Sequence, residues 1–146
     1  MTIADEQTPS NARTVVVADP DETARRRVVE VLRELAARCA LTVAIHEVER
    51  GDDADAKIRE VRPDLVVAEI LLEGHSGLTL LRRHADATPT AAWVFVTELT
   101  APVDRQWALR CGAHGYLAKP CDTQTLAERL AKPLERGGAS AREKLV

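Results

Sequence analysis

Short apolar runs alternate along the chain with longer segments in which apolar residues recur every three or four positions. A short run without polar alternation is typical of a strand buried on both faces, and the second pattern is typical of a helix with one buried face. The alternation predicts five strand–helix pairs. The expected strands cover residues 14–18, 41–46, 65–68, 91–97 and 115–118, and the last two helices cover 103–110 and 122–134.

This alternation also determines the expected fold class. Consecutive strands separated by helices form a parallel sheet, and the helices then cover both of its faces. The sequence therefore predicts an α/β domain with three layers (αβα). We place it at residues 13–134, between a polar, flexible leader at 1–12 and a flexible C-terminal tail at 135–146 that has glycines and mixed charge. No length is left for a second domain.

Composition narrows the class of protein. The chain has 146 residues, 45% of them hydrophobic and 29% charged, with a net charge of −3. This balance gives no reason to expect nucleic-acid binding, and no signal peptide or membrane-spanning run is present in the sequence. Cys39, Cys111 and Cys121 lack the spacing of metal ligands. We therefore expect a cytoplasmic protein without nucleic-acid or membrane partners.

The candidate chemistry begins at Glu69, a lone carboxylate at the carboxyl end of the apolar run 65–68. A loop with Gly74 and Gly77 follows it, and Leu78 then opens a helical pattern. In open α/β sheets, ligands bind just beyond the carboxyl ends of the strands. Glu69 is therefore the first candidate site residue.

The stretch from Pro63 to Leu78, P-D-L-V-V-A-E-I-L-L-E-G-H-S-G-L, resembles the phosphoacceptor segment of the response-regulator receiver family, the signalling modules of two-component systems. In that family, Pro-Asp and four apolar residues precede the aspartate that accepts the phosphoryl group. This sequence carries Glu69 at the acceptor position, and Glu73 where the family often has proline. The resemblance covers about residues 13–133 and implies a flavodoxin-like fold, a doubly wound (βα)5 domain with a five-stranded parallel sheet.

Further family landmarks stand at or near the ends of the other expected strands. Asp19 matches the first of two acids that help to bind magnesium, but Pro20 occupies the position of the second. Thr97 matches the hydroxyl residue at the end of the fourth strand, and Lys119 matches the lysine that ends the fifth. Tyr116 matches the aromatic switch residue. The resemblance implies that Thr97, Tyr116 and Lys119 form the switch and phosphate pocket.

Three departures from the family pattern converge on this pocket. Pro20 removes one anionic ligand from a magnesium site, which needs carboxylate oxygens in near-octahedral geometry. Glu69 extends the acceptor by one C–C bond, about 1.5 Å, and a displacement near 1 Å can lower a rate on the order of 100-fold. Glu98 adds a charged side chain where the family has a small residue. We expect phosphorylation to be lost or very weak and no cofactor to be needed; Mg²⁺ binds only if a vestigial site at Asp19 still holds it.

Glu69 has two functional interpretations. Its carboxylate either imitates a phosphorylated aspartate by reaching Lys119 and Thr97, or forms a buried pair with Lys119 in a pocket that no longer switches. We favour the buried pair, because a carboxylate has less charge and fewer acceptor oxygens than a phosphoryl group. In both cases the chain is a phosphorylation-independent interaction module and not an enzyme. Its expected partner is a histidine kinase, a downstream effector or another domain.

Some of these residues also have purely structural explanations. Asp19, Pro20 and Glu22 have the form of a helix start in which Asp19 is the cap. Thr97 and Tyr116 also fit simple packing at the ends of strands. The four histidines lack metal-ligand spacing, so we expect solvated or capping roles for His46, His75, His84 and His114.

The two tryptophans lie on different elements. Trp93 falls within the expected fourth strand, where it should pack in the core. Trp107 falls on the expected fourth helix, where it either packs in the core or lies on the face formed by the fourth helix, the fifth strand and the fifth helix. Receivers commonly dimerise through that face, and aromatic side chains are favoured interface anchors. A homodimer through this face is therefore one expected assembly.

Two alternative functions remain open. The first is a conventional, magnesium-dependent receiver that is phosphorylated. The second is a haloacid-dehalogenase-type phosphatase, because V-V-V-A-D-P-D-E-T resembles the first motif of that family, with Asp19 as nucleophile and Asp21 as general acid/base. Against the phosphatase, no acidic metal motif follows Lys119 and no cap segment is visible. It also leaves the segment around Glu69 unexplained.

Overall fold

The computed structural model describes residues 11–87 and 91–144, with the backbone alone from 137 onward. Of the predicted leader at 1–12, residues 1–10 lie outside the described residues. Strands and helices alternate along the chain. The strands are β1 (Ala12–Ala18), β2 (Thr42–Val48), β3 (Leu65–Ala68), β4 (Ala92–Thr97) and β5 (Gly115–Ala118), and the helices are α2 (Glu22–Arg38), α3 (Gly51–Val61), α4 (Gly77–His84), α5 (Pro102–Arg110) and α6 (Thr123–Lys144).

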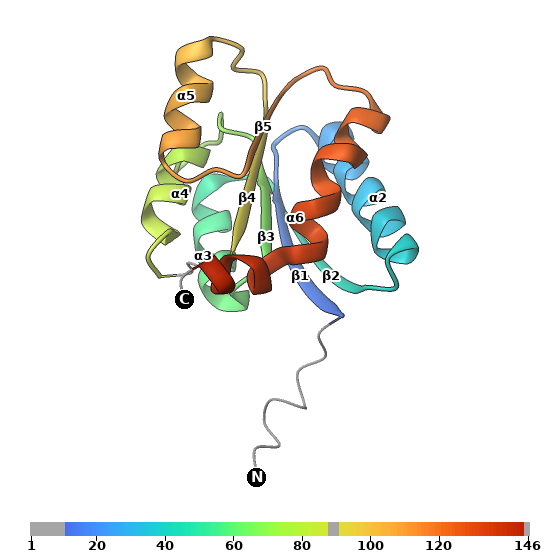
Figure 1. The fold of residues 1–146 in the computed structure, drawn as a ribbon. Coiled ribbons are helices and arrows are strands. Elements are labelled where there is room, and N and C mark those ends of the chain that lie inside the picture. Colours follow the sequence, from blue (N-terminus) through green and yellow to red (C-terminus); the bar gives the residue numbers. More distant parts are fainter. Residues whose placement is uncertain (1–10, 88–90, 145–146) are drawn as a thin grey trace.

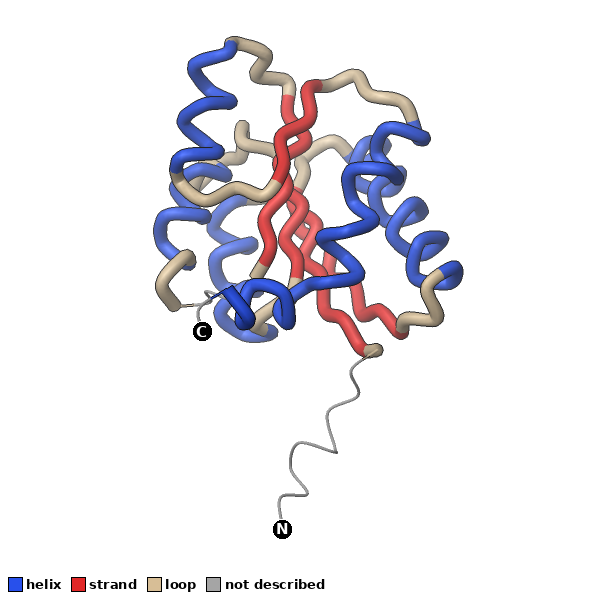
Figure 2. The backbone as a smooth tube through the Cα atoms, in the orientation of Figure 1, coloured by secondary structure: helices blue, strands red, loops and turns tan. Residues whose placement is uncertain are grey.

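The strands form one parallel sheet in the order β2-β1-β3-β4-β5. Helices α2 and α6 lie on one face of the sheet, and α3, α4 and α5 lie on the other (Figures 1 and 2). This is the flavodoxin-like, doubly wound α/β fold that the sequence predicts. The strand order switches direction beside β1 and β3, and such a switch point is where ligands bind in this class of sheet. None of the helices in the described part of the chain has the length and apolar character needed to span a membrane.

The apolar runs form strands because both of their faces are covered. Val15 and Val17 of β1 pack in the core beneath α2 and α6, whereas Val16 and Ala18 pack in the core on the opposite face. Successive side chains of a strand point to opposite faces, so a central strand needs apolar residues at every position. Every residue of β3 and β4 is buried for the same reason.

Several element boundaries differ from the predicted ones. β1 begins at Ala12 and not at residue 14. β2 extends to Val48 and not only to residue 46. The last helix, expected to end near Leu134, continues to Lys144. Arg13 at the start of β1 donates hydrogen bonds to the backbone carbonyls of Leu134 (2.9 Å) and Glu135. This contact joins the start of β1 to α6 at the point where the helix was predicted to end, before the glycines of the sequence.

The start of α2 corrects a further prediction. Asp21, and not Asp19, is the N-cap, because its side chain accepts hydrogen bonds from the backbone N–H groups of Thr23 (3.0 Å) and Ala24 (3.4 Å). The helix therefore begins at Glu22. An aspartate at the N-cap satisfies two of the free N–H groups of the first turn. As a result, the carboxylate of Asp19 does not cap α2 and lies at the edge of the sheet.

A buried polar cluster joins α3 to α4. Asp55, which is 3% exposed, accepts hydrogen bonds from Arg59 (2.6 Å) and from two nitrogens of Arg83 (3.1 and 3.2 Å). Its Oδ1 also lies 2.7 Å from Nε2 of the buried His84. The expectation that His84 is solvated or caps a helix is therefore wrong, because its partner lies on another helix. Burial raises the pKa of Asp55, but hydrogen bonds from Arg83 and His84, with the charges of both arginines, outweigh this and hold the pKa below its ordinary value.

Replacing Asp55 by Asn should lower the free energy of unfolding by about 3 kcal/mol at pH 7, because it removes one partner of a buried ionic cluster. The pKa of Asp55 is lower in the folded than in the unfolded state. Its contribution is therefore present above the unfolded pKa, near 4, and is lost as the pH falls through the folded pKa. Urea unfolding of both proteins at pH 7 and pH 3 measures the difference. Asp53→Asn, an exposed change on the same helix, is the control; a difference for Asp55→Asn that is equal at both pH values would contradict this account.

Candidate functional site

The carboxyl ends of four neighbouring strands bring the candidate residues together. Asp19 follows β1, Glu69 follows β3, Thr97 ends β4 and Lys119 follows β5. These strands are consecutive in the parallel sheet, so their carboxyl ends meet at one edge. Asp19, Glu69 and Thr97 are buried there, and Lys119 is partly buried.

Glu69 lies at the centre of this site, with 3% of the residue exposed. Its Oε2 accepts hydrogen bonds from the hydroxyl of Thr97 and from the N–H of Leu71, the latter at 3.0 Å. Its Oε1 accepts one from the N–H of Glu98 at 3.3 Å and lies 3.1 Å from Nζ of Lys119. Each oxygen therefore has two partners, which compensates for the loss of hydration of a buried carboxylate.

Lys119 bridges two carboxylates. Its Nζ donates to Oδ2 of Asp19 at 2.8 Å and pairs with Oε1 of Glu69 at 3.1 Å. Burial lowers the pKa of Lys119, but the hydrogen bonds and charges of Asp19 and Glu69 raise it above its ordinary value, so the amine stays protonated. Burial raises the pKa of Asp19 above its ordinary value, although hydrogen bonds with Lys119 and with the N–H of Asp21 lower it in part.

The oxygen ligands at this edge do not match a magnesium site. Asp19 uses Oδ2 for Lys119 and Oδ1 for the N–H of Asp21, at 2.9 Å. The ring of Pro20 has no ligand atom. Within residues 11–87 and 91–136, no group of three or more His, Cys, Asp and Glu side chains is arranged to hold a metal ion. Mg²⁺ prefers six oxygens in octahedral geometry, and this set of donors is already engaged by Lys119 and Thr97.

A chain of hydrogen bonds leads from Glu69 to Tyr116. The hydroxyl of Thr97, which donates to Glu69, accepts a bond from the N–H of Leu99 at 3.2 Å. The carbonyl of Leu99 accepts a bond from the hydroxyl of the buried Tyr116 at 2.8 Å. Burial raises the pKa of Tyr116, and the charges of Asp104 and Glu69 add to this, so the hydroxyl keeps its proton and donates it. Sequence reasoning missed Leu99 because only its backbone takes part.

The loop after Glu69 is fixed by close backbone packing. A Cβ at Gly77 would lie 2.8 Å from the carbonyl oxygen of Glu69, so only glycine allows α4 to start so near the site. The side chain of Ser76 caps α4 by accepting a bond from the N–H of Thr79. Glu73, at the position where the receiver family often has proline, pairs with Arg50 at 2.9 Å.

Comparison with known proteins decides the family. The family model of the response regulator receiver domain matches residues 15–131, most of the chain. The chain belongs to the response regulator receiver domain family. The transcriptional regulatory protein BaeR of Escherichia coli is 32% identical over 135 residues, which cover 90% of this chain and 50% of BaeR. Protein PilH of Pseudomonas aeruginosa is 33% identical over 84 residues, covering 56% of this chain and 69% of PilH.

Solved receiver structures share the fold. The receiver domain of the response regulator NarL from Mycobacterium tuberculosis superposes with a TM-score of 0.73, covering 84% of this chain and 95% of that domain at 20% identity. Identity this low shows the fold alone. The chain spans about a third to a half of the length of the transcriptional regulators that it matches, 34% for TrcR of Mycobacterium tuberculosis and 50% for BaeR.

The two tryptophans of this receiver differ in burial. Trp93 is buried in β4, as predicted, and its backbone N–H donates a hydrogen bond to Nδ1 of His114 at 3.0 Å. Trp107 on α5 is 49% exposed, as are substantial parts of Val103 and Leu109 on the same helix. The alternative that Trp107 packs in the core is therefore wrong. Its use as an interface anchor stays a prediction.

The hydrogen-bond chain predicts that Tyr116 responds to a change at Glu69. Tyr116 is the only tyrosine in the sequence, so protein labelled with 3-fluorotyrosine gives a single ¹⁹F resonance. In Glu69→Ala, the Thr97 hydroxyl loses its acceptor, and in Thr97→Val the chain is cut; both should shift or broaden the resonance. Glu73→Ala removes an exposed carboxylate from the same loop and should leave it unchanged. If the resonance is the same in all four proteins, Glu69 and Tyr116 are not coupled.

Proposed function

We propose that the chain is an atypical receiver that signals without phosphorylation, through contacts with other proteins, with Glu69 in the phosphoacceptor position. The observation that carries the proposal is the engagement of Glu69. Its carboxylate already binds the hydroxyl of Thr97 and the ammonium of Lys119. In receivers these are the groups expected to contact the phosphoryl group, so Glu69 satisfies them from within the chain.

Charge at the site supports the same proposal. The site has three carboxylates, those of Asp19, Glu69 and Glu98, and one ammonium group, that of Lys119. Asp19 and Glu69 already share this ammonium group. A phosphoryl donor is itself an anion, and its approach to this net negative site is unfavourable. A magnesium ion that would offset this charge has no second acid, because Pro20 replaces it. We therefore propose that the receiver needs no magnesium.

Within this proposal we favour imitation of the phosphorylated state over an inert pair. An inert pair requires only the contact between Glu69 and Lys119. The structure adds the bond from Thr97 and its extension through Leu99 to Tyr116. A carboxylate that holds the hydroxyl residue and the aromatic residue together biases the pocket toward one arrangement. From the sequence we favoured the inert pair, because a carboxylate has less charge than a phosphoryl group. The hydrogen bonds that lead through Thr97 to Tyr116 favour imitation instead.

The partners proposed are other signalling proteins in the cytoplasm, either a histidine kinase or a downstream effector. The curated relatives named above as transcriptional regulators are much longer than this chain, so any output on transcription would require a further domain or a partner. A homodimer is proposed through the face that includes α5, where Val103, Trp107 and Leu109 are exposed. Exposed large apolar residues on one helix favour such a contact.

A conventional, phosphorylated receiver is the second candidate function. It is favoured by the family match and by the presence of Asp19, Thr97 and Lys119 at the expected edge of the sheet. Two observations argue against the phosphatase alternative. Asp21, which it requires as general acid/base, uses its carboxylate to cap α2, and the family matched is the receiver family.

Restoration of the missing acids separates the two receiver functions. The wild type and Glu69→Asp should gain no phosphoryl group from acetyl phosphate and Mg²⁺, because Pro20 still deprives the metal of a ligand. In the double variant that combines Pro20→Asp with Glu69→Asp, the modified fraction should be at least tenfold larger than in either single variant. Intact-protein mass spectrometry measures the modified fraction, and Glu73→Asp is the matched control on the same loop. Efficient modification of the wild type would establish the conventional receiver instead.

A further inference from the structure

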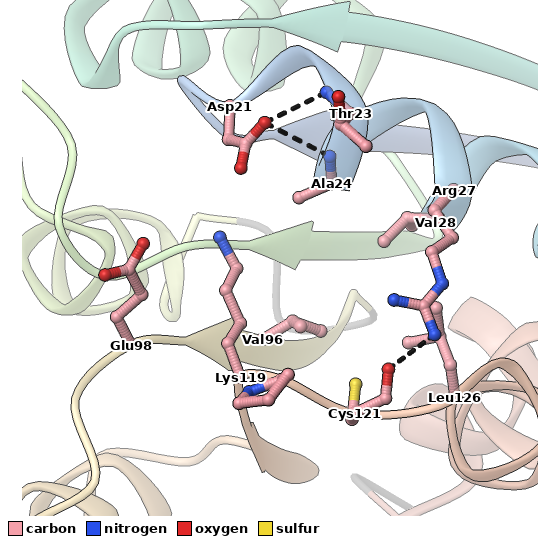
Figure 3. Close-up of a pocket in the computed structure, with 11 residues that line it drawn as sticks. Asp21, Thr23, Ala24, Arg27, Val28, Val96, Glu98, Lys119, Cys121 and Leu126 are labelled. Carbon is pink, nitrogen blue, oxygen red and sulfur yellow. Dashed lines mark hydrogen bonds between the residues drawn. The ribbon is translucent and has the colours of Figure 1, made fainter.

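A pocket of about 440 Å³ opens beside Lys119, between the start of α2 and the loop that joins β5 to α6. Figure 3 shows the side chains that line it. Its volume lies within the range of small-molecule sites in proteins. The wall contains Glu98 and Lys119, so the pocket adjoins the site of Glu69 and shares Lys119 with it.

The inner wall of this pocket is apolar. Val28 of α2, Val96 of β4 and Leu126 of α6 are each largely buried and line it together with Ala24 and other small residues. These side chains come from three elements that the core holds in place, so the wall is preformed. Burial of an aliphatic group against such a wall contributes roughly 25 cal/mol per Å² of apolar surface removed from water.

The rim of the pocket carries two carboxylates that lack a cation. Asp21 and Glu98 form no ion pair within residues 11–87 and 91–136. In the view of Figure 3 they lie on the same side as the ammonium of Lys119, and that ammonium is already shared by Asp19 and Glu69. The side of the pocket near Glu98 is therefore electronegative.

The cation on the other side of the pocket is already engaged. Arg27 donates to the carbonyl of Cys121 at 2.5 Å and to the hydroxyl of Thr123 at 3.3 Å. Hydrogen bonds from Thr125 lower the pKa of the nearby Asp122, and the charge of Arg27 lowers it further. The charge of Arg27 is therefore partly balanced by Asp122. Arg27 closes one side of the pocket and leaves Asp21 and Glu98 as the charged groups that lack a counter-ion.

We propose that this pocket binds a small organic cation, a protonated primary amine on an apolar body. The ammonium group lies between the carboxylates of Asp21 and Glu98, and the apolar body covers Val28, Val96 and Leu126. A small anion is disfavoured there, because Asp21 and Glu98 line the pocket and the ammonium of Lys119 is already shared by Asp19 and Glu69. This inference does not depend on the function proposed for Glu69, because Asp21 and Glu98 can bind a cation whether or not Glu69 imitates a phosphoryl group.

Titration of the ¹⁵N-labelled protein with n-hexylamine at pH 7 tests the proposal, with 1-hexanol and hexanoate as probes of the same length. Hexylamine should shift the amide signals of Thr23, Ala24 and Leu126 in a saturable manner and bind at least fivefold more tightly than the other two probes. Asp21→Asn, which retains a cap for α2, and Glu98→Gln should each weaken hexylamine binding about threefold to fivefold, as expected for partly exposed ion pairs. Glu30→Gln removes an exposed carboxylate of α2 that does not line the pocket and should have no effect.

Three outcomes would overturn the proposal. The first is the absence of saturable shifts with hexylamine at millimolar concentration. The second is equal binding of the amine, the alcohol and the carboxylate, which would reduce the pocket to a nonspecific apolar surface. The third is hexylamine binding that Asp21→Asn and Glu98→Gln leave unchanged relative to Glu30→Gln. Because each variant replaces an exposed residue, folding of the variants is not in question, and their amide spectra verify it.

Discussion

The ammonium group of Lys119, held between the carboxylates of Asp19 and Glu69, is the interaction on which the site depends. Two carboxylates buried at one edge of a sheet repel each other and lose their hydration, so they persist as anions only with a cation between them. The ends of β1, β3 and β5 fix these three groups relative to one another. Any external cation or phosphoryl group would have to displace an interaction that the chain makes by itself.

The fold could be predicted from the sequence because each central strand is an uninterrupted apolar run and each helix has one apolar face. The position of Glu69 followed from the same reasoning, since ligands bind beyond the strand ends of such sheets, whereas Thr97 and Lys119 were predicted from the resemblance to the receiver family. What could not be predicted depends on contacts between distant segments or on backbone groups. The pairing of His84 with Asp55 and the part played by the carbonyl of Leu99 belong to this class. Asp19 was predicted as the cap because Pro20 fits the first helical position and Glu22 the position that reaches back, whereas the structure has Asp21 as the cap.

Glu98 links the two regions at this edge of the sheet. Its backbone N–H donates to Glu69, while its side chain lies on the rim of the adjoining pocket (Figure 3). A small residue at this position would leave the site open and the pocket without one of its two uncompensated carboxylates. The glutamate that we propose hinders an anionic phosphoryl donor is also the one that we propose favours a cationic ligand, since both effects follow from one added negative charge.

The central claim is that Glu69 already occupies the place of the phosphoryl group. An amide-resolved NMR titration of the unmodified protein, first with Mg²⁺ and then with beryllofluoride, which mimics a phosphoryl group on a carboxylate, tests it most directly. The account predicts no saturable shifts at Asp19, Glu69, Thr97 or Lys119 at millimolar Mg²⁺, and none when beryllofluoride is added. Saturable shifts at these residues that spread to Tyr116 would show that the pocket still binds metal and switches, and would contradict it.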